Sequence, residues 1–465
     1  MLKNNPIESI KKKFYIESYG CQMNLSDSQI IASILSKEGF GTTQDPKQAD
    51  LILLNTCSIR EKAEQTIYNR LKTFNSVKKK KPSLLIGILG CMAERLKHKL
   101  LEEEKIVDLV AGPDAYRDIP NLIKSVDGGT KAINVLLSKE ETYGDISPVR
   151  LGDNGVSAFV SITRGCDNMC TFCVVPFTRG RERSRDPYTI VKECKELYSN
   201  GYKEVTLLGQ NVDSYLWYGG GLKKDFINCS DMEKMASVDF SDLLELVAKA
   251  VPTMRIRFST SNPYDISKKV LNKIAHYPNI CKHIHLPVQS GSNKILKLMN
   301  RKHTKEEYIT LIDTIRKIIP DCAISHDMIT GFCNETKEDH LETLGLMEYV
   351  KYEFGYMFYY SPRPGTLAYK KFIDDVPLEV KKHRLDEIIT LQRKHSYYRL
   401  SEQIGTIKEV LIEKSSKKDP SFWQGRTPQN TMVVFPKKNY KPSEFVKVKI
   451  HSHTSATLIG DVVSK

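Results

Sequence analysis

Three cysteines lie close together near the middle of the chain, in the run Arg164-Gly-Cys166-Asp-Asn-Met-Cys170-Thr-Phe-Cys173. At this spacing, three thiolates can bind three corners of a 4Fe-4S cluster. The fourth iron then has no protein ligand and stays open to a substrate or cofactor, unlike the irons of clusters that only transfer electrons. A zinc site is the alternative. Zinc sites usually have four ligands in paired spacings, however, and no nearby Cys or His supplies a fourth.

A second set of three cysteines is spread over the amino-terminal part of the chain. Cys21, Cys57 and Cys91 each come just after a predicted strand and just before a predicted helix, about one strand-helix unit apart. In a parallel sheet, such loops lie at the same edge, and the helix dipoles there favour thiolate over thiol. Each cysteine alone would be interpreted as a buried structural residue. Their shared placement instead favours a second cluster, again with one iron left open.

The surroundings of both sets resemble those in the radical S-adenosylmethionine (SAM) superfamily, and specifically its methylthiotransferase branch. This resemblance rests on the runs Gly20-Cys-Gln-Met-Asn24, Asn55-Thr-Cys-Ser-Ile-Arg60, Gly90-Cys-Met-Ala93 and on residues 174–185. The resemblance implies that SAM chelates the open iron at Cys166, Cys170 and Cys173, and that its reductive cleavage yields a 5'-deoxyadenosyl radical. It further implies that Cys21, Cys57 and Cys91 bind an auxiliary 4Fe-4S cluster.

The elements that must position these cysteines follow from the hydrophobic pattern. Residues 14–18, 50–55 and 83–89 are predicted strands, and 26–38 and 92–104 are predicted helices between or after them. A further helix is expected to open at Ser58, with Glu61 completing a capping box. This alternation indicates an α/β domain with a parallel sheet over residues 14–130, after a basic tail at 1–13.

Residues 131–157 carry Gly-, Pro- and Asp-rich turns and are predicted to form a linker. Six strand-like runs then recur, each followed by a helical stretch, which indicates a partial α/β barrel over residues 158–400. These runs are 158–163, 204–208, 255–258, 283–286, 323–330 and 356–360. Residues 217–238 look like a surface insertion, and 378–402 like a helix that leads to the last domain.

Polar residues at the strand ends of the predicted barrel are candidates to hold SAM and substrate, because a barrel binds its ligands there. The candidates are Gln210, Asn211, Ser259, Gln289, Asp327 and Arg363. For any one of them, a role in a turn or a helix cap is an equal alternative. Their common position at the mouth favours ligand contact.

Residues 401–465 contain β-branched runs separated by turns, which predicts a small all-β domain. From 402 onward they hold 11 Lys or Arg against 6 Asp or Glu, so phosphate binding and an ordinary basic surface are both open. The run Gln424-Gly-Arg-Thr-Pro-Gln-Asn430 resembles the RNA-binding TRAM module. The arginines from Arg179 to Arg185 are candidates to hold an RNA backbone near the reacting atom. The alternative is that one or two of them pair with Glu182, Asp186 or the SAM carboxylate.

The whole chain has 465 residues, with 70 Lys and Arg against 56 Asp and Glu, which favours a polyanionic partner. It shows no signal-peptide core and no apolar stretch long enough to span a membrane, so a cytoplasmic protein without membrane contact is expected. Eleven cysteines in such a chain suggest metal binding or catalysis rather than disulfides.

Within the family, residues 20–24 and 177–183 most resemble the tRNA branch that acts on N6-isopentenyladenosine beside the anticodon. The resemblance implies transfer of a methylthio group to C2 of that base, with two 4Fe-4S clusters, SAM and a low-potential electron donor. Alternative substrates are threonylcarbamoyladenosine in tRNA and an aspartate of a ribosomal protein. A non-catalytic iron-sulfur RNA-binding protein is the alternative from another class.

Overall fold

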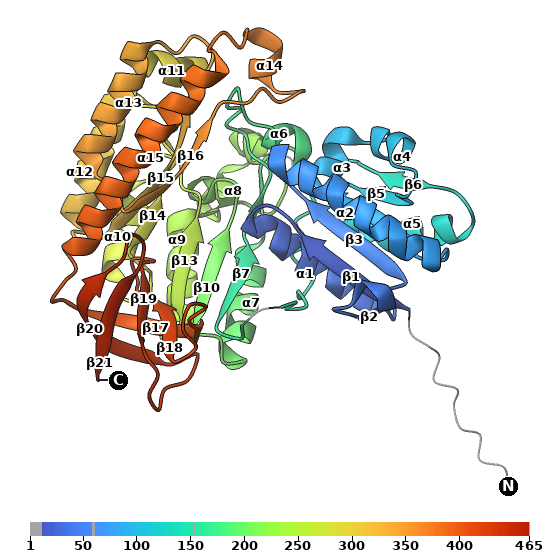
Figure 1. Ribbon diagram of the computed structural model, residues 1–465, viewed down its shortest axis with the longest axis horizontal. Coiled ribbons are helices and arrows are strands. Elements are labelled where there is room, and N and C mark those ends of the chain that lie inside the picture. The colour runs from blue at the N-terminus through green and yellow to red at the C-terminus, as the bar shows by residue number, and fades with distance from the viewer. Residues whose placement is uncertain (1–11, 58–60, 153, 465) are drawn as a thin grey trace. The chain divides into compact units, whose positions relative to one another are not determined.

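The computed structural model describes residues 12–57, 61–152 and 154–464 of the chain (Figure 1). These residues form two compact units. The first comprises the chain up to Leu151 together with Val174–Gly180, and the second comprises Gly152–Cys173 together with the chain from Arg181 onward. The predicted tail up to residue 11 and the predicted capping box at Ser58 fall outside the described residues.

The first unit is built on a six-stranded parallel sheet with the order β2-β1-β3-β4-β5-β6. Its strands are β1 (Lys13–Ser18), β2 (Gly41–Thr42), β3 (Leu51–Thr56), β4 (Leu85–Gly90), β5 (Leu109–Ala111) and β6 (Ala132–Asn134). Its helices are α1 (Gln22–Lys37), α2 (Glu61–Lys80), α3 (Cys91–Leu96), α4 (Lys99–Glu103), α5 (Ile119–Asp127) and α6 (Val175–Thr178), with short 3-10 turns at Pro46–Gln48 and Tyr116–Asp118. Strand β6 lies within residues 131–157, the expected linker.

Alternate residues of the central strand β3 point into two different hydrophobic cores. Leu51 and Leu53 pack into one core, and Ile52 and Leu54 pack into the other. All four are fully buried, as expected for a strand that is covered on both faces. The helix expected over 92–104 is in fact two helices, because the backbone of Lys97 turns to a φ of 51° and cannot continue the helix.

The second unit begins with six parallel strands in two groups of three, ordered β13-β10-β7 and β14-β15-β16. These are β7 (Ser157–Ser161), β10 (Glu204–Leu208), β13 (Arg255–Ser259), β14 (His283–His285), β15 (Ala323–Thr330) and β16 (Phe354–Tyr359). A bridge between Ile256 and Ile280 joins the two groups. The six strands therefore form the predicted partial barrel.

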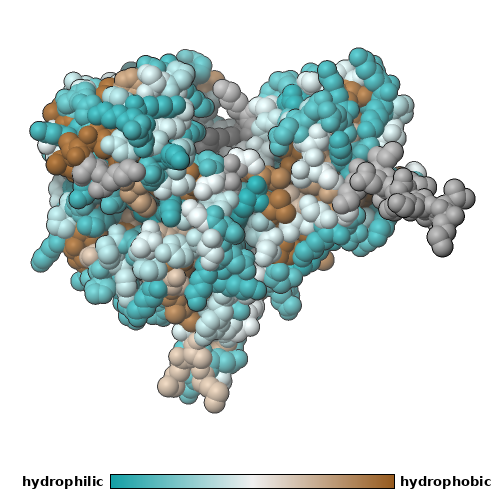
Figure 2. Space-filling model, turned by 90° about the horizontal axis from the view of Figure 1, so that it is seen from below, coloured by the Kyte–Doolittle hydropathy of each residue, from teal (hydrophilic) through white to brown (hydrophobic). Residues whose placement is uncertain are grey.

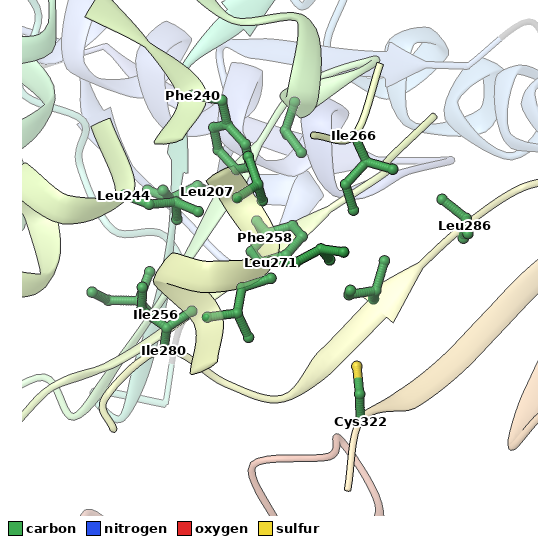
Figure 3. Close-up of a cluster of buried hydrophobic side chains, with 14 of the residues drawn as sticks. Leu207, Phe240, Leu244, Ile256, Phe258, Ile266, Leu271, Ile280, Leu286 and Cys322 are labelled. Atoms are coloured by element: carbon green, nitrogen blue, oxygen red, sulfur yellow. The ribbon is translucent and has the colours of Figure 1, made fainter. Parts of the chain in front are cut away.

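Helices follow the barrel strands and bury one continuous core with them (Figure 3). Phe258 of β13 meets Phe240 edge to face, with ring centroids 5.4 Å apart. The helices of this core are α7 (Pro187–Ser199), α9 (Phe240–Ala250), α10 (Lys268–His276), α12 (Lys305–Ile318), α13 (Lys337–Val350) and α15 (Leu378–Ser401). Helices α11 (Asn293–Leu298) and α14 (Leu367–Lys371) pack in a separate small cluster around Phe332. Two short strands, β8 (Thr163–Arg164) and β9 (Arg183–Ser184), pair antiparallel beside the first cysteine of the barrel loop.

The predicted insertion over 217–238 is bounded by the antiparallel pair β11 (Leu216–Trp217) and β12 (Val238–Asp239). It contains a 3-10 segment, Lys223–Asn228, and helix α8 (Asp231–Met235). Another short 3-10 turn, Val212–Ser214, precedes it.

The last domain is a closed barrel with the order β17-β18-β19-β21-β20. Its strands are β17 (Ile407–Ser415), β18 (Phe422–Arg426), β19 (Met432–Pro436), β20 (Phe445–His453) and β21 (Leu458–Ser464). The all-β prediction for this domain is therefore confirmed.

Across the described residues, no helix has both the length and the apolar character that crossing a bilayer requires. The face of the molecule in Figure 2 is mainly hydrophilic in colour, and hydrophobic residues gather there only in small separate patches.

Candidate active site with two cysteine sets

The first cysteine set lies at the carboxyl edge of three neighbouring parallel strands. Cys21 precedes α1 after β1, Cys57 directly follows β3, and Cys91 opens α3 directly after β4. Strand β3 pairs with β1 on one side and with β4 on the other. The parallel register therefore places all three loops at one sheet edge, as the spacing predicts.

Two glycines and two asparagines shape this edge. Gly20 and Gly90, just before Cys21 and Cys91, have φ values of 117° and 86°, which a residue with a Cβ rarely adopts. A Cβ on Gly20 would lie 2.2 Å from the Cβ of Cys57. Asn24 accepts a hydrogen bond from the Cys21 thiol at 3.2 Å, and its backbone oxygen accepts one from the Asn55 amide at 2.8 Å. The motif asparagines thus tie the Cys21 loop to the strand that carries Cys57.

A buried arginine lies beside these thiols within the same unit. The Nε of Arg179 donates to Sγ of Cys91 at 3.3 Å, and its Nη2 donates to Asp27 at 2.8 Å. The Tyr116 hydroxyl donates to the same Asp27 oxygen at 3.2 Å. The side chains of Arg179 and Asp27 are 2% and 0% exposed, so each is the main counter-charge available to the other.

These surroundings separate the acidities of the thiols. A hydrogen bond from Cys57 and the charge of Arg179 lower the pKa of Cys21 to about 6. Burial raises the pKa of Cys91, although Arg179 opposes that effect. A thiolate is the metal-binding form, so the arginine favours the state that a cluster requires.

The second cysteine set lies on the loop that follows β8. The end of α11 and the residues after it hold this loop. Thr171 donates its backbone N–H to the carbonyl oxygen of Met299 at 3.0 Å, and its hydroxyl donates to that of Leu298 at 2.9 Å. The Asn300 amide donates to the carbonyl of Met169, whose φ is 50°. The three cysteines themselves are partly exposed. The loop therefore has a fixed backbone and accessible thiols.

An arginine also lies beside this second set. Nη1 of Arg301 donates to Sγ of Cys170 at 3.5 Å, and Nη2 donates to the carbonyl oxygen of Pro287 at 2.6 Å. In the part of the chain that the structure describes, Arg301 forms no ion pair with a carboxylate. Burial, together with the neighbouring Cys173, raises the pKa of Cys166.

Two carboxyl groups lie near the barrel mouth in surroundings that disfavour their charge. Burial raises the pKa of Glu182 and of Asp213 to about 7 each. Glu182 accepts a hydrogen bond from Ser214 at 2.5 Å and lies 3.5 Å from the Lys223 ammonium. Asp213 accepts the backbone N–H of Asn262 at 3.1 Å.

The predicted SAM and substrate residues follow the barrel strands, with one exception. Gln210 and Asn211 follow β10, Ser259 ends β13, and Gln289 and Arg363 follow β14 and β16, respectively, whereas Asp327 lies inside β15.

Several of these residues also have structural contacts. The Asn211 amide donates to Asp265 at 2.6 Å, the Ser259 hydroxyl lies 3.2 Å from that of Thr260, and Asp327 lies 3.4 Å from His285. The carbonyl oxygen of Arg363 accepts the Thr366 hydroxyl at 2.8 Å and so holds a turn.

Unsatisfied polar atoms at the same strand ends fit a polar ligand. Thr163 Oγ1 and Asn211 Oδ1 are buried and have no hydrogen-bond partner among the described residues. Such atoms are costly unless something binds them. The backbones of Thr260 and Gln289, with φ values of 73° and 77°, are also strained, which is typical of ligand sites. The amine, carboxylate and ribose hydroxyls of SAM match these donors and acceptors.

Within the described ranges, no three His, Cys, Asp or Glu side chains are gathered as the ligands of a single metal ion. A cubane cluster is held differently, because each thiolate binds a different iron atom. The thiol sets and the arginines that donate to their sulfurs are a donor set of the kind that suits such a cluster.

The arginines from Arg179 to Arg185 do not form an exposed surface that could hold an RNA backbone, which was one of the two predictions for them. Arg179, Arg183 and Arg185 are buried, and Arg185 pairs with Glu193 at 2.5 Å. Only the side chain of Arg181, 44% exposed and 2.9 Å from Asp167, reaches solvent substantially. The alternative, pairing inside the protein, is confirmed for Arg179, Arg181 and Arg185, although Asp27, Asp167 and Glu193 were not the expected partners.

Sequence reasoning missed Asp27, Tyr116 and Arg301. Asp27 belongs to a polar run in α1, from Ser26 to Gln29, that is buried throughout. The absence of any Lys or Glu from this helix face is the one signal that could have indicated burial. No comparable pattern marks Arg301.

Comparison with known families matches the three parts of the chain separately. Residues 13–112 match an uncharacterized protein family described as UPF0004, residues 160–347 match the radical SAM superfamily, and residues 401–463 match the TRAM domain. Among solved structures, the radical SAM methyltransferase TsrM from Kitasatospora setae has a similar fold. Its TM-score is 0.55 at 12% identity, over 77% of this chain and 74% of that one.

Curated relatives match the chain along its whole length. The tRNA-2-methylthio-N(6)-dimethylallyladenosine synthase of Christiangramia forsetii is 67% identical, over 97% of this chain and 94% of that protein. The protein of the same name from Flavobacterium johnsoniae is 64% identical, over 100% and 96%, respectively. The chain therefore belongs to the tRNA-2-methylthio-N(6)-dimethylallyladenosine synthase family of radical SAM enzymes.

Proposed function

We propose that this protein transfers a methylthio group to C2 of N6-isopentenyladenosine next to the anticodon of tRNA. The observation that carries the proposal is the full-length likeness to synthases of that name. The three-cysteine loop at the mouth of a partial barrel adds support from the structure. The target is an unactivated aromatic C–H, which no side-chain base could deprotonate at neutral pH.

A 4Fe-4S cluster with SAM on its open iron supplies the radical chemistry for this step. Cys166, Cys170 and Cys173 would hold that cluster. The chain's own contribution is orientation: the carbonyl oxygens of Leu298 and Met299 and the Asn300 side-chain amide fix the cysteine loop. In addition, Arg301 donates to the Cys170 sulfur. Gln210, Asn211, Ser259, Gln289, Asp327 and Arg363 are proposed to contact SAM or the base.

Cys21, Cys57 and Cys91 are proposed to hold a second 4Fe-4S cluster that carries the sulfur to be transferred. Their placement at one sheet edge and the donation from Arg179 to Cys91 support this assignment. A low-potential electron donor and a cytoplasmic location complete the proposal, since radical SAM chemistry needs a reductant and tRNA is a cytoplasmic substrate.

The test is an anaerobic assay of the protein reconstituted with iron and sulfide. SAM, a low-potential reductant and tRNA carrying isopentenyladenosine are added, and the nucleosides are analysed by mass spectrometry. We expect 2-methylthio-isopentenyladenosine together with 5'-deoxyadenosine. If 5'-deoxyadenosine forms without that nucleoside, the substrate is wrong, and a parallel sample with threonylcarbamoyl tRNA tests the nearest alternative. If neither product forms in cluster-replete protein, the non-catalytic RNA-binding alternative takes its place.

A further inference from the structure

The carboxy-terminal barrel has two ends that differ in their contacts. The turn 427–431 joins β18 to β19 at one end, next to the pair Arg426 and Met432. The loop 416–421 joins β17 to β18 at the other end, next to the pair Ser415 and Trp423. Because Phe422 pairs with Pro436, the chain after β19 also leaves from this second end.

The first end is fastened to the radical SAM barrel by two buried arginines of β13. Arg257 donates to the carbonyl oxygens of Thr427 and Pro428 at 2.7 and 3.0 Å. Arg255 donates to the carbonyl oxygen of Arg426 at 2.7 Å and pairs with Glu409 at 2.8 Å.

Most of the run 424–430, whose sequence resembles an RNA-binding motif, is therefore engaged inside the protein. The two arginines of β13 occupy the carbonyl oxygens of Arg426, Thr427 and Pro428. The Gln429 amide donates to Asp321 of the radical SAM domain at 3.0 Å. Thr427 is almost fully buried.

The second end carries five lysines, which we call the lysine end. They are Lys414, Lys417, Lys418, Lys437 and Lys438. All are exposed except Lys437, which is half-buried with its ammonium 4.3 Å from the centre of the Trp423 ring. Among the described residues, none of the five pairs with a carboxylate, and the one acid of the loop, Asp419, instead accepts hydrogen bonds from Ser421.

We propose that the lysine end binds the phosphate backbone of the tRNA substrate, and that the run 424–430 is an internal docking element. Lysines that have no carboxylate partner and gather at one end of a barrel form the electrostatic footprint of a polyanion site. The docked end is less suited to that part, because Arg426 already pairs with Glu413 at 3.2 Å and the Gln429 amide already donates to Asp321. This inference rests on the proposed function, because it takes tRNA as the partner.

The test compares equal losses of charge at two places in the same barrel. One variant is Lys417→Gln with Lys418→Gln, and its matched control is Lys447→Gln with Lys449→Gln, two exposed lysines of β20. A third variant replaces all five lysines of the lysine end by Gln. Affinity for isopentenyladenosine-containing tRNA is measured by fluorescence anisotropy at several salt concentrations.

We expect the five-lysine variant to bind at least ~10-fold more weakly. The slope of log affinity against log salt concentration should become shallower by about one for each phosphate that a lysine no longer neutralises. The Lys417/Lys418 pair should weaken binding more than the control pair. Cleavage of SAM without RNA and the melting temperature should not change. Wild-type affinity in the five-lysine variant, or an equal loss in the control, would overturn the inference.

Photo-crosslinking of 4-thiouridine-labelled tRNA to the unmodified protein gives a second readout that depends on no variant. Crosslinked peptides should contain residues 414–421 or 437–438 rather than 427–431. A wild-type protein that modifies tRNA but crosslinks through 427–431 refutes only the lysine end. A wild-type protein that makes 5'-deoxyadenosine but neither binds nor modifies tRNA refutes the proposed function itself.

Discussion

The two cysteine sets each have one arginine that donates to a sulfur, but the two arginines differ in how their charge is balanced. Arg179 donates to Cys91 while paired with the buried Asp27. Arg301 donates to Cys170 and to a backbone carbonyl, with no carboxylate partner in the described parts of the chain. The charge of Arg179 is balanced by the buried carboxylate of Asp27. The charge of Arg301 is not balanced by a carboxylate among the described residues, so it can act on the bound cluster.

Other groups follow the same division. At the first set, Asp27 is satisfied by Arg179 and Tyr116. At the barrel mouth, Glu182 and Asp213 have pKa values raised to about 7. Buried Thr163 Oγ1 and Asn211 Oδ1 there have no hydrogen-bond partner among the residues that the structure describes. The comparison teaches that the buried charges beside the first set are balanced within the protein, whereas polar groups at the barrel mouth are left for ligands.

Removing the thiols of one set at a time is the strongest test of the difference between the two sets. Replacing Cys166, Cys170 and Cys173 by Ala should abolish both SAM cleavage and methylthiolation. Replacing Cys21, Cys57 and Cys91 by Ala should abolish only methylthiolation, and each triple variant should keep about four of about eight irons per chain. Iron analysis and 5'-deoxyadenosine assays check this. Unchanged iron content in the Cys21 variant would rule out the two-cluster assignment.

Breaking the neutral pair should be the largest effect on stability. Arg179→Gln leaves the Asp27 carboxylate buried without its counter-charge, which costs about 3–5 kcal/mol. Adding Asp27→Asn should recover much of that loss, because the stranded charge is then removed. Denaturant unfolding of the single and double variants measures the coupling. If the double variant is as unstable as Arg179→Gln, the pair is not what makes the arginine important.

Arg301→Gln should affect the redox properties more than the fold. No buried carboxylate is stranded, so the loss of stability should be only about 1 kcal/mol. Losing a positive charge and a hydrogen bond at a cluster sulfur should lower the reduction potential by roughly tens of millivolts. Potentiometry followed by electron paramagnetic resonance measures this in protein lacking Cys21, Cys57 and Cys91. Arg301→Lys, which keeps the charge, should restore most of the shift.

Asp213→Asn tests, through the pH dependence of stability, whether the barrel mouth holds a carboxyl group that burial keeps protonated. The pKa of Asp213 is raised to about 7 in the folded protein, above the ordinary value of about 4 for an unfolded chain. Between about pH 4 and 7, this carboxyl is ionised in the unfolded chain but still protonated in the folded protein. The free energy of unfolding therefore falls as pH rises through that range. The variant should gain melting temperature over wild type at pH 8, less at pH 6 and little at pH 4. Asp225→Asn, a change at an exposed carboxylate, is the control and should show no such difference.

Local patterns predicted the backbone of both sites well. The positions of Cys21, Cys57 and Cys91 after three strands follow from hydrophobic runs, and parallel topology alone then brings them to one edge. The barrel strands and the final all-β domain were predicted for the same reason, because the residues that a strand buries recur in the sequence as hydrophobic runs. The break at Lys97 was missed, because a single residue with positive φ leaves no compositional sign.

Long-range polar contacts could not be predicted in this way. Arg179 meets Asp27 across a large gap in sequence, and Arg257 meets Thr427 similarly, with no period that links the partners. The likeness of 424–430 to an RNA-binding run predicted a contact with RNA. In the structure, carbonyl oxygens of this run instead accept hydrogen bonds from Arg255 and Arg257 of the radical SAM barrel. Such assignments depend on which polar groups burial brings together, and only the folded chain determines that.

The glycines at the first cysteine edge limit how this region can vary by mutation. At Gly20 the space for a side chain is already filled by Cys57, and at Gly90 a Cβ would lie 2.5 Å from the Asn55 side-chain oxygen and 2.7 Å from the Thr56 carbonyl oxygen. Even alanine must displace a cysteine or a strand end. In a saturation scan, these two positions should therefore tolerate as little as the thiols beside them, although neither carries a reactive group.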